Sequence, residues 1–382
     1  MKSELPLHLL IIEDSPTAVH LLKIQLEREL TRAFFTSEVE TLAEAQQQLA
    51  NHRIDLVLLD LNLPDSSGLD TFRNFHRKFR EVPIVVLSGM SDESIALEAV
   101  RGGAQDYVVK ASFDESNHLN RVIQFALERV QRRSMEHELE SAQKVQNSLY
   151  PDLAPDIDGF EIAGNSVPAN HVSGDYYDFI PMANDRLGVV VADVAGHGLA
   201  PALKMAETRA CLHALAHAWQ DLQETHNDLC QILRRTNAVL TSPTNSRFTT
   251  LFFILLDPAG RSFTYAGAGH RAFLIRTDGS HEELPSTGAV LGLFPVLDIA
   301  TSDPIQLQPG EMIFLPTDGI EEARSTDGSL FGKERMLSEL KGHQEIPVST
   351  VIEQVFQSAQ DFSGEHPQLD DMTAIALRRN AL

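Results

Sequence analysis

Short apolar runs alternate with helix-like segments through the first third of the chain. Four of these runs have the length and composition of buried strands: Leu7–Ile12, Ile54–Leu59, Val82–Leu87 and the shorter Gln105–Val109. Segments with apolar residues at helical spacing lie between or beside them: Ser15–Leu30, Leu42–Asn51, Leu69–Phe79 and Glu93–Arg101. Because uniformly apolar strands joined by helices form parallel sheets buried on both faces, the pattern predicts a doubly wound α/β domain over residues 1–130.

The pattern changes in residues 153–382, where short β-like runs follow one another and only a few helices are inserted. The predicted strands are Leu187–Ala192, Thr249–Leu256, Ser262–Ala266, Phe273–Arg276, Met312–Leu315 and Thr373–Leu377. The predicted helices are Ala200–Trp219, Leu229–Leu240, Lys333–Leu340 and Val348–Ser358. Runs of strands interrupted by helices indicate an α+β domain built as a layered β-sandwich.

A long helical stretch, from about Ser116 to Leu149, joins the two predicted domains. Its first half has the apolar spacing of a last helix for the α/β domain, whereas its second half is polar with a narrow apolar seam. The polar segment Gln131–Ser134 separates the halves, and Pro151 ends the helix because proline cannot continue it. We therefore expect residues 131–152 to be a helical linker that pairs with a second copy as a coiled coil, giving a homodimer.

Charge and cysteine content narrow the class of protein. The formal net charge is −23, and so strongly acidic a chain repels nucleic acid and anionic membranes. We therefore expect no nucleic-acid or membrane partner. The two cysteines, Cys211 and Cys230, have no metal-binding or redox spacing, and the sequence shows neither a membrane-length apolar run nor a signal sequence at its start. These features predict a cytoplasmic protein.

Polar residues follow the predicted parallel strands. The acidic pair Glu13 and Asp14 follows the first strand, and Asp60, Ser88 and Lys110 stand at the ends of three others. The carboxyl ends of parallel strands meet at one edge of a sheet, where close carboxylates repel one another unless a cation joins them. Oxygen ligands suit Mg²⁺, and a lysine suits a phosphoryl oxygen. We predict that Asp60 accepts a phosphoryl group, that Glu13 and Asp14 hold Mg²⁺, that Lys110 neutralises charge and that Ser88 hydrogen-bonds the phosphoryl group.

These residues, in this order, resemble the receiver domains of two-component response regulators. The resemblance covers the first third of the chain and implies the flavodoxin-like fold of that family. It implies that Asp60 and the backbone carbonyl of Asn62 are also metal ligands, and that Tyr107 is the aromatic switch residue. The partner that it implies is a histidine kinase or a phosphotransfer protein.

A second set of acids lies in the second half of the chain, each at a junction between a β-run and a turn. The motifs are Gly174-Asp175, Asp193-Val194-Ala195-Gly196-His197-Gly198, Thr317-Asp318-Gly319 and Asp370-Asp371-Met372-Thr373. The sequence has no cysteine cluster, and the residues of these motifs offer mainly carboxylate oxygens, so hard oxygen ligands indicate Mg²⁺ or Mn²⁺ rather than zinc. Two such ions held close together can activate a water for attack on a phosphate ester.

These motifs resemble the PPM-type metal-dependent serine/threonine phosphatases, and best the bacterial branch of sporulation and stress-response phosphatases. Weaker features of that branch are Phe248-Thr249-Thr250-Leu251, Gly269-His270, Leu291-Gly292 and the linker residues Val145-Gln146. The resemblance implies the following metal ligands: Asp193 bridging two ions, the backbone carbonyl of Val194, Asp318, Asp175, and Asp370 with Asp371 as its alternative. Arg271-Ala272 departs from the asparagine and proline that the family tends to have there, so a substrate-facing turn is expected to differ.

The two resemblances together imply a signalling enzyme. Phosphorylation of Asp60 is expected to control a metal-dependent phosphoserine/phosphothreonine phosphatase acting on a protein like an anti-sigma factor antagonist in a partner-switching pathway. The alternative is a phosphorylation-gated adaptor that binds partners with a weak or inactive phosphatase fold. A DNA-binding output is disfavoured because no helix-turn-helix with a basic face follows the first domain.

Overall fold

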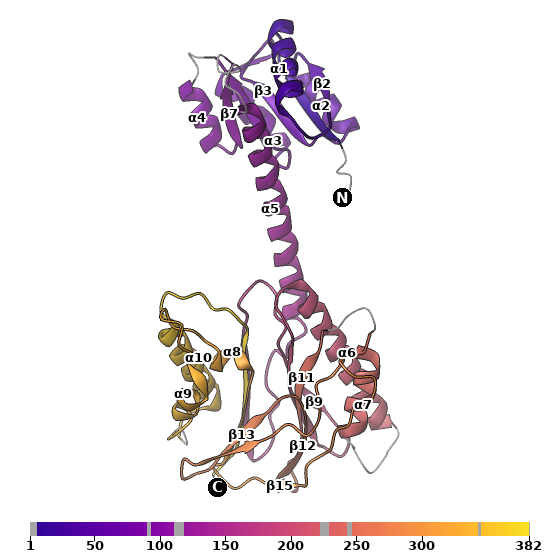
Figure 1. The fold of residues 1–382 in the computed structure, drawn as a ribbon, viewed down its shortest axis with the longest axis vertical. Coiled ribbons are helices and arrows are strands. Elements are labelled where there is room, and N and C mark those ends of the chain that lie inside the picture. Colours follow the sequence, from indigo (N-terminus) through magenta and orange to yellow (C-terminus); the bar gives the residue numbers. More distant parts are fainter. Residues whose placement is uncertain are drawn as a thin grey trace. The chain divides into compact units, whose positions relative to one another are not determined.

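The computed structural model describes residues 6–89, 93–110, 118–221, 229–242, 247–342 and 345–381. Contacts between residues divide the chain into two compact units, Met1–Glu138 and Leu139–Leu382 (Figure 1). The division falls inside the predicted linker, and the finer bounds 1–130, 131–152 and 153–382 remain a prediction. Among the described residues, no helix is both long and apolar enough to cross a membrane.

The N-terminal unit contains one parallel sheet in the order β2-β1-β3-β6-β7. Its strands are β1 (Leu7–Ile12), β2 (Phe34–Val39), β3 (Leu56–Asp60), β6 (Ile84–Ser88) and β7 (Asp106–Val109), and a small hairpin adds β4 (Asn62–Leu63) and β5 (Ser66–Ser67). The helices are α1 (Pro16–Glu29), α2 (Leu42–Asn51), α3 (Leu69–Lys78), α4 (Glu93–Arg101) and the start of α5 (His118–Asn147). The predicted doubly wound, flavodoxin-like α/β fold is confirmed.

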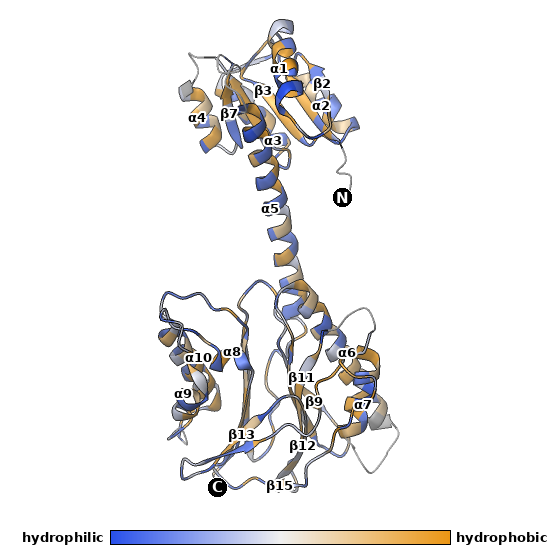
Figure 2. Ribbon diagram, in the orientation of Figure 1, coloured by the Kyte–Doolittle hydropathy of each residue, from blue (hydrophilic) through white to orange (hydrophobic). Residues whose placement is uncertain are grey.

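The core of this unit lies on both faces of the sheet. Along β1, Leu10 and Ile12 pack into one hydrophobic cluster while Leu9 and Ile11 pack into the other, as the alternation of side chains in a strand requires. Figure 2 shows that the strands of this sheet are predominantly hydrophobic. Strand β2 was not indicated by any apolar run, because it is an edge strand whose residues are mostly half-buried or exposed.

The C-terminal unit contains two antiparallel sheets, β15-β12-β11-β10-β9 and β14-β13-β16-β17-β8. The strands of the first are β9 (Tyr176–Pro181), β10 (Leu187–Val194), β11 (Thr249–Asp257), β12 (Ser262–Ala268) and β15 (Ile305–Gln306). Those of the second are β8 (Phe160–Val167), β13 (Ala272–Ile275), β14 (His281–Leu284), β16 (Met312–Pro316) and β17 (Met372–Arg379). Helices α6 (Leu199–Asp221) and α7 (Leu229–Leu240) lie on one side, and α8 (Asp318–Glu321), α9 (Gly332–Glu339) and α10 (Val348–Ser363) on the other (Figure 1).

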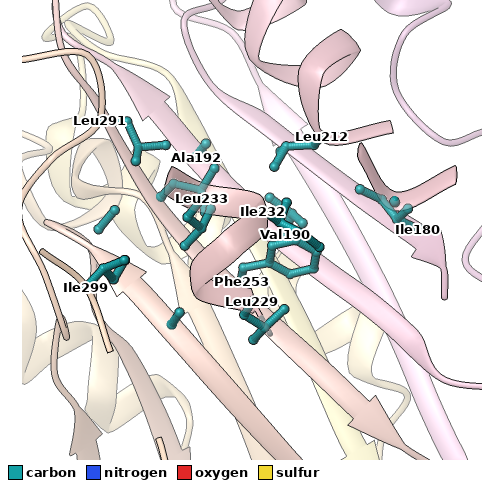
Figure 3. Packing of buried hydrophobic residues seen from close by; sticks show 14 of the residues in the cluster. Ile180, Val190, Ala192, Leu212, Leu229, Ile232, Leu233, Phe253, Leu291 and Ile299 are labelled. Atoms are coloured by element: carbon teal, nitrogen blue, oxygen red, sulfur yellow. The ribbon is translucent and has the colours of Figure 1, made fainter. Parts of the chain in front are cut away.

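Three hydrophobic clusters hold these four layers together. Val191 and Phe252 of the first sheet meet Leu315 and Ile375 of the second in the cluster between the sheets. A second cluster joins the outer face of the first sheet to α6 and α7, where Val190, Ala192 and Phe253 pack against Leu212, Ile232 and Leu233 (Figure 3). A third joins the second sheet to α9 and α10. The predicted α+β layered β-sandwich is therefore confirmed.

Helix α5 is continuous through the polar segment Gln131–Ser134, where the sequence indicated a change of phase. Its first turns belong to the core of the N-terminal unit through Leu119, Ile123 and Ala126. Residues 131–138 are all exposed, and burial returns only at Gln146 within the C-terminal unit. The two ends of α5 therefore contribute to different units, and its residues 131–138 pack into neither core.

Candidate functional site

The carboxyl edge of the parallel sheet brings together the residues predicted for phosphoryl transfer. The ammonium of Lys110 lies 2.6 Å from Oε2 of Glu13 and 2.9 Å from Oδ2 of Asp60. Ligand atoms of Glu13, Asp14 and Asp60 lie within 4.8 Å of one another. These residues belong to different strand ends, so the parallel arrangement of the sheet places them together.

The electrostatics of this edge favour a divalent cation. Glu13 and Asp60 are buried, and burial raises the pKa of Glu13 although the hydrogen bond from Lys110 opposes the rise. Burial opposes the charge of Lys110, but its hydrogen bonds to Glu13 and Asp60 prevail and raise its pKa. Three carboxylates facing one ammonium leave negative charge uncompensated, and oxygen-only ligation of this kind fits Mg²⁺.

Ser88 has an unusual position beside this cluster. Its side chain is 1% exposed, and its hydroxyl has no hydrogen-bond partner among the described residues. A buried hydroxyl without a partner costs free energy, so the site suits a ligand that supplies an acceptor. Tyr107 is half-buried on the neighbouring β7, and Asn62 is exposed in β4. The switch role of Tyr107 and the ligand role of the Asn62 carbonyl remain predictions.

In the C-terminal unit, the predicted aspartates come from strand ends of both sheets. Asp175 immediately precedes β9, and Asp193 lies in β10, which pairs with β9. Asp318 follows β16 and Asp370 precedes β17, which are neighbours in the second sheet. Val194 is buried at the end of β10 beside Asp193. The sandwich thus places residues that are far apart in sequence at a shared edge.

The charges of these aspartates act on one another. Burial raises the pKa of Asp175 well above its usual range, and the neighbouring Asp193 raises it further. Burial, followed by Asp318 and Asp370, raises the pKa of Asp193 to about 7, and burial with Asp370 raises that of Asp318 to about 6. Their oxygens are nevertheless more widely spaced than those of the receiver cluster, which is the only group of three ligand atoms within 4.8 Å found in the described residues.

Thr317 links Asp175 to the second sheet. Its hydroxyl donates to Oδ2 of Asp175 over 2.8 Å and accepts from the backbone N–H of Thr373 over 3.0 Å. The side chain of Asp175 is therefore tied to the junction of β16 and β17. Sequence reasoning assigned no role to Thr317, although its position directly before Asp318 was the available signal.

The adjacent acids Asp370 and Asp371 have different environments. Each carboxylate oxygen of Asp371 accepts a backbone N–H, from Ala169 and from Gly174, both at 2.8 Å. Asp371 is buried and orders the loop before Asp175, whereas Asp370 is half-exposed. A Cβ atom on Gly319 would lie 2.0 Å from the carbonyl oxygen of Asp371, so this close approach of α8 requires glycine.

The end of α5 and the segment after it hold the backbone around Asp175. Gln146 donates through Nε2 to the carbonyl of Ser173 over 2.7 Å and accepts through Oε1 from its N–H over 2.9 Å. Tyr150 donates its hydroxyl proton to the carbonyl of Asp175 over 2.7 Å. From the sequence, Gln146 was identified only as part of a linker pattern, and Tyr150 was not singled out. A buried glutamine at the end of an exposed helix becomes visible only in the fold.

Fold and sites together define a class: a response-regulator receiver domain followed by a phosphatase domain of the PP2C type. Comparison with known protein families supports the assignment of both domains. The response regulator receiver domain family matches residues 9–123, and the family of Stage II sporulation protein E (SpoIIE) matches residues 183–380. Because the second match spans more than half of the chain, the chain belongs to the SpoIIE family.

Individual relatives support the same assignment. The chain is 31% identical to phosphoserine phosphatase RsbU of Bacillus subtilis over 248 residues, covering 63% of this chain and 70% of RsbU. It is 28% identical to protein IcfG of Synechocystis over 267 residues, covering 64% of this chain but only 42% of IcfG. The solved SiaA-PP2C domain of Pseudomonas aeruginosa aligns with a TM-score of 0.57 and 25% identity, covering 65% of this chain and 98% of that domain. The predicted receiver and phosphatase domains are thus confirmed by homology.

Proposed function

We propose that phosphorylation of Asp60 controls hydrolysis of phosphoserine or phosphothreonine by the C-terminal unit. The observation that carries the enzymatic part is the position of Asp175, Asp193, Asp318 and Asp370 at strand ends on one edge of the sandwich, where burial and neighbouring carboxylates raise the pKa of Asp175, Asp193 and Asp318. Mutual repulsion of this strength is relieved when divalent cations bind between the carboxylates.

The residues present fit two Mg²⁺ or Mn²⁺ ions. All the side-chain donors are carboxylate oxygens, which suit these hard cations. Asp193 would serve both ions and the backbone carbonyl of Val194 would be a further ligand. Asp318 and Asp370 would hold one ion and Asp175 the other. Asp371 is the weaker candidate because both of its oxygens already accept backbone hydrogen bonds. When bound, such ions supply an activated water and stabilise charge on the phosphate.

In the receiver, Glu13, Asp14, Asp60 and the carbonyl of Asn62 would hold Mg²⁺ while Asp60 accepts the phosphoryl group. The hydroxyl of Ser88, which has no hydrogen-bond partner among the described residues, is suited to a phosphoryl oxygen, and Lys110 already contacts the acceptor carboxylate. A histidine kinase or phosphotransfer protein is the proposed donor. Tyr107 is proposed to move when Ser88 is drawn towards the phosphoryl group.

Coupling between the units is proposed to run through α5. Gln146 and Tyr150 contact the backbone from Ser173 to Asp175, so a shift of the last turn of the helix moves a proposed metal ligand. Met135 and Val145 are 64% and 66% exposed on the same helix, as expected of a helix that pairs with a second copy. We therefore retain the predicted homodimer through residues 131–152.

The proposed substrate is a phosphorylated protein similar to an anti-sigma factor antagonist. The support is the similarity to RsbU, which is named a phosphoserine phosphatase. A partner of this kind requires neither nucleic acid nor a membrane, in keeping with the net charge of −23. The cytoplasm is the proposed compartment.

The decisive experiment measures hydrolysis of p-nitrophenyl phosphate and of a phosphoserine protein by the full chain with Mn²⁺ or Mg²⁺. We expect metal-dependent turnover that chelation removes and Asp193→Ala abolishes. Partner binding without turnover under either metal would instead favour the phosphorylation-gated adaptor. With turnover established, Asp60→Asn is expected to remove its dependence on a phosphodonor, and unchanged control in that variant would contradict the role of the receiver.

A further inference from the structure

A cavity of about 320 Å³ opens at the aspartate edge of the C-terminal unit, and Arg271 lies on its wall. Asp193, Asp318 and Thr317 line the same cavity. Its other titratable lining residues are His270, Glu283 and Glu321. Burial lowers the pKa of His270 to about 4, so this imidazole is neutral near pH 7. Among the described residues that line this cavity, Arg271 therefore supplies the only positive charge.

Within the described part of the chain, the guanidinium of Arg271 makes hydrogen bonds through one nitrogen only. Its Nη2 atom donates to both oxygens of Glu321, at 2.9 and 2.7 Å, and the group lies 5.6 Å from the ring centre of Phe273. A guanidinium has five N–H donors, of which Nη2 carries two. The remaining donors, on Nη1 and Nε, make no hydrogen bond within the described residues. Arg271 can thus bind a further acceptor.

Its partner Glu321 connects this pair to the proposed metal site. Glu321 ends the short helix α8, which begins at Asp318. The Arg271 side chain is 43% exposed, whereas that of Glu321 is 15% exposed. The carboxylate therefore forms the inner member of the pair, and the arginine faces the side from which a solute enters.

A phosphate monoester that enters this cavity brings negative charge to a wall that carries four carboxylates and one guanidinium. Bound cations would compensate the negative charge of the aspartates. Phosphoryl oxygens that do not contact the cations need a further hydrogen-bond donor. The planar fork of arginine matches phosphate in geometry and charge. We infer that Arg271 binds the phosphoryl group of the substrate and that Glu321 competes with the phosphate for the same guanidinium. This inference rests on the proposed phosphatase function and adds a specificity-determining residue to it.

A purely structural role predicts something different. If the ion pair only fixes α8 to the turn before β13, removing either partner loosens Asp318. Both variants then weaken metal binding. If Glu321 competes with phosphate, the two variants act in opposite directions. The direction in which each variant changes phosphate binding therefore distinguishes a structural role from a role in phosphate binding.

The test uses the full chain with Mn²⁺ and the variants Arg271→Ala, Arg271→Lys and Glu321→Gln. Binding of inorganic phosphate and of Mn²⁺ is measured by calorimetry, and KM and kcat with p-nitrophenyl phosphate. We expect Arg271→Ala to weaken phosphate binding and raise KM by about tenfold or more, because a charge-assisted hydrogen bond is lost. Arg271→Lys should recover part of this loss. Glu321→Gln should strengthen phosphate binding and lower KM by roughly threefold, with Mn²⁺ affinity unchanged in all three.

Arg276→Ala is the matched control, because Arg276 also pairs with glutamates, Glu282 and Glu311, but does not line the cavity. It should leave phosphate binding unchanged. Equal phosphate affinity in wild type and Arg271→Ala, or a parallel loss of Mn²⁺ affinity in Arg271→Ala and Glu321→Gln, overturns this inference while leaving the phosphatase intact. A wild-type chain that neither turns over nor binds phosphate with Mn²⁺ overturns both.

Discussion

The hydroxyl of Tyr150 donates a hydrogen bond of 2.7 Å to the backbone carbonyl of Asp175, whose side chain accepts another from Thr317. Asp175 is thus held from two directions, by the segment that follows α5 and by the end of β16. Burial raises the pKa of Tyr150 well above its ordinary value, so this hydroxyl keeps its proton and acts as a donor across the working pH range.

Replacement of Tyr150 by phenylalanine should loosen Asp175 without removing a charge. The carbonyl left without its donor costs about 1–3 kcal/mol, and we expect kcat/KM to fall about tenfold and Mn²⁺ to bind more weakly. Steady-state kinetics and metal titration measure both effects. Tyr265→Phe, in the same unit but stacked on Phe252 away from the aspartates, is the control. Equal activity of the two variants would contradict a positioning role for Tyr150.

Gln146 should matter more for control than for folding of the domain. Gln146→Ala leaves both the N–H and the carbonyl of Ser173 without a partner, so the last turn of α5 no longer holds this loop. We expect turnover that no longer responds to a phosphoryl mimic such as beryllofluoride. Lys144→Ala changes an exposed residue of the same helix and should keep the response. A normal response in Gln146→Ala would show that the signal takes another route.

Ser88→Ala should separate signalling from stability. The Ser88 hydroxyl makes no hydrogen bond among the described residues, so its removal should change the free energy of unfolding by less than about 0.5 kcal/mol. The variant should still be phosphorylated on Asp60, but regulation of turnover should be lost or much reduced. Denaturant unfolding and phosphoprotein gels measure the first two properties. A large loss of stability would mean that the hydroxyl has a structural partner.

Metal binding to the C-terminal unit should release protons. In the metal-free protein, burial and neighbouring acids raise the pKa of Asp193 to about 7 and of Asp318 to about 6. Below these values both carboxylates hold protons that a cation must displace, so affinity should rise as the pH increases from 5 to 8 and then level off. Calorimetry at pH 6 in buffers of different ionisation enthalpy should give about one to two protons released. Asp193→Asn should reduce that number, whereas pH-independent affinity would contradict the shared cation site.

Much of the fold could be predicted because it depends on local pattern. Strand β1 and helices α2, α4 and α7 have the bounds that the sequence indicated, since each carries an uninterrupted run or a clear helical period. Strand β2 was not predicted because an edge strand need not be apolar. Strand β8 was not predicted because its residues are mostly half-buried. The sequence predicted a long helical stretch with a change of phase at Gln131–Ser134, and α5 runs through this polar segment because exposed helical turns require no apolar face.

The sequence by itself determined which side chains are candidates for the chemistry, because aspartates at strand–turn junctions, a lysine and a serine are readable from local context. Only the tertiary structure decided how they are held: Thr317 and Tyr150 on Asp175, Asp371 turned to the backbone of its loop, and Arg271 beside Glu321. The physical reason is that these contacts join segments from about 25 to almost 200 residues apart, and such contacts depend on strand register and sheet stacking, which no local pattern encodes.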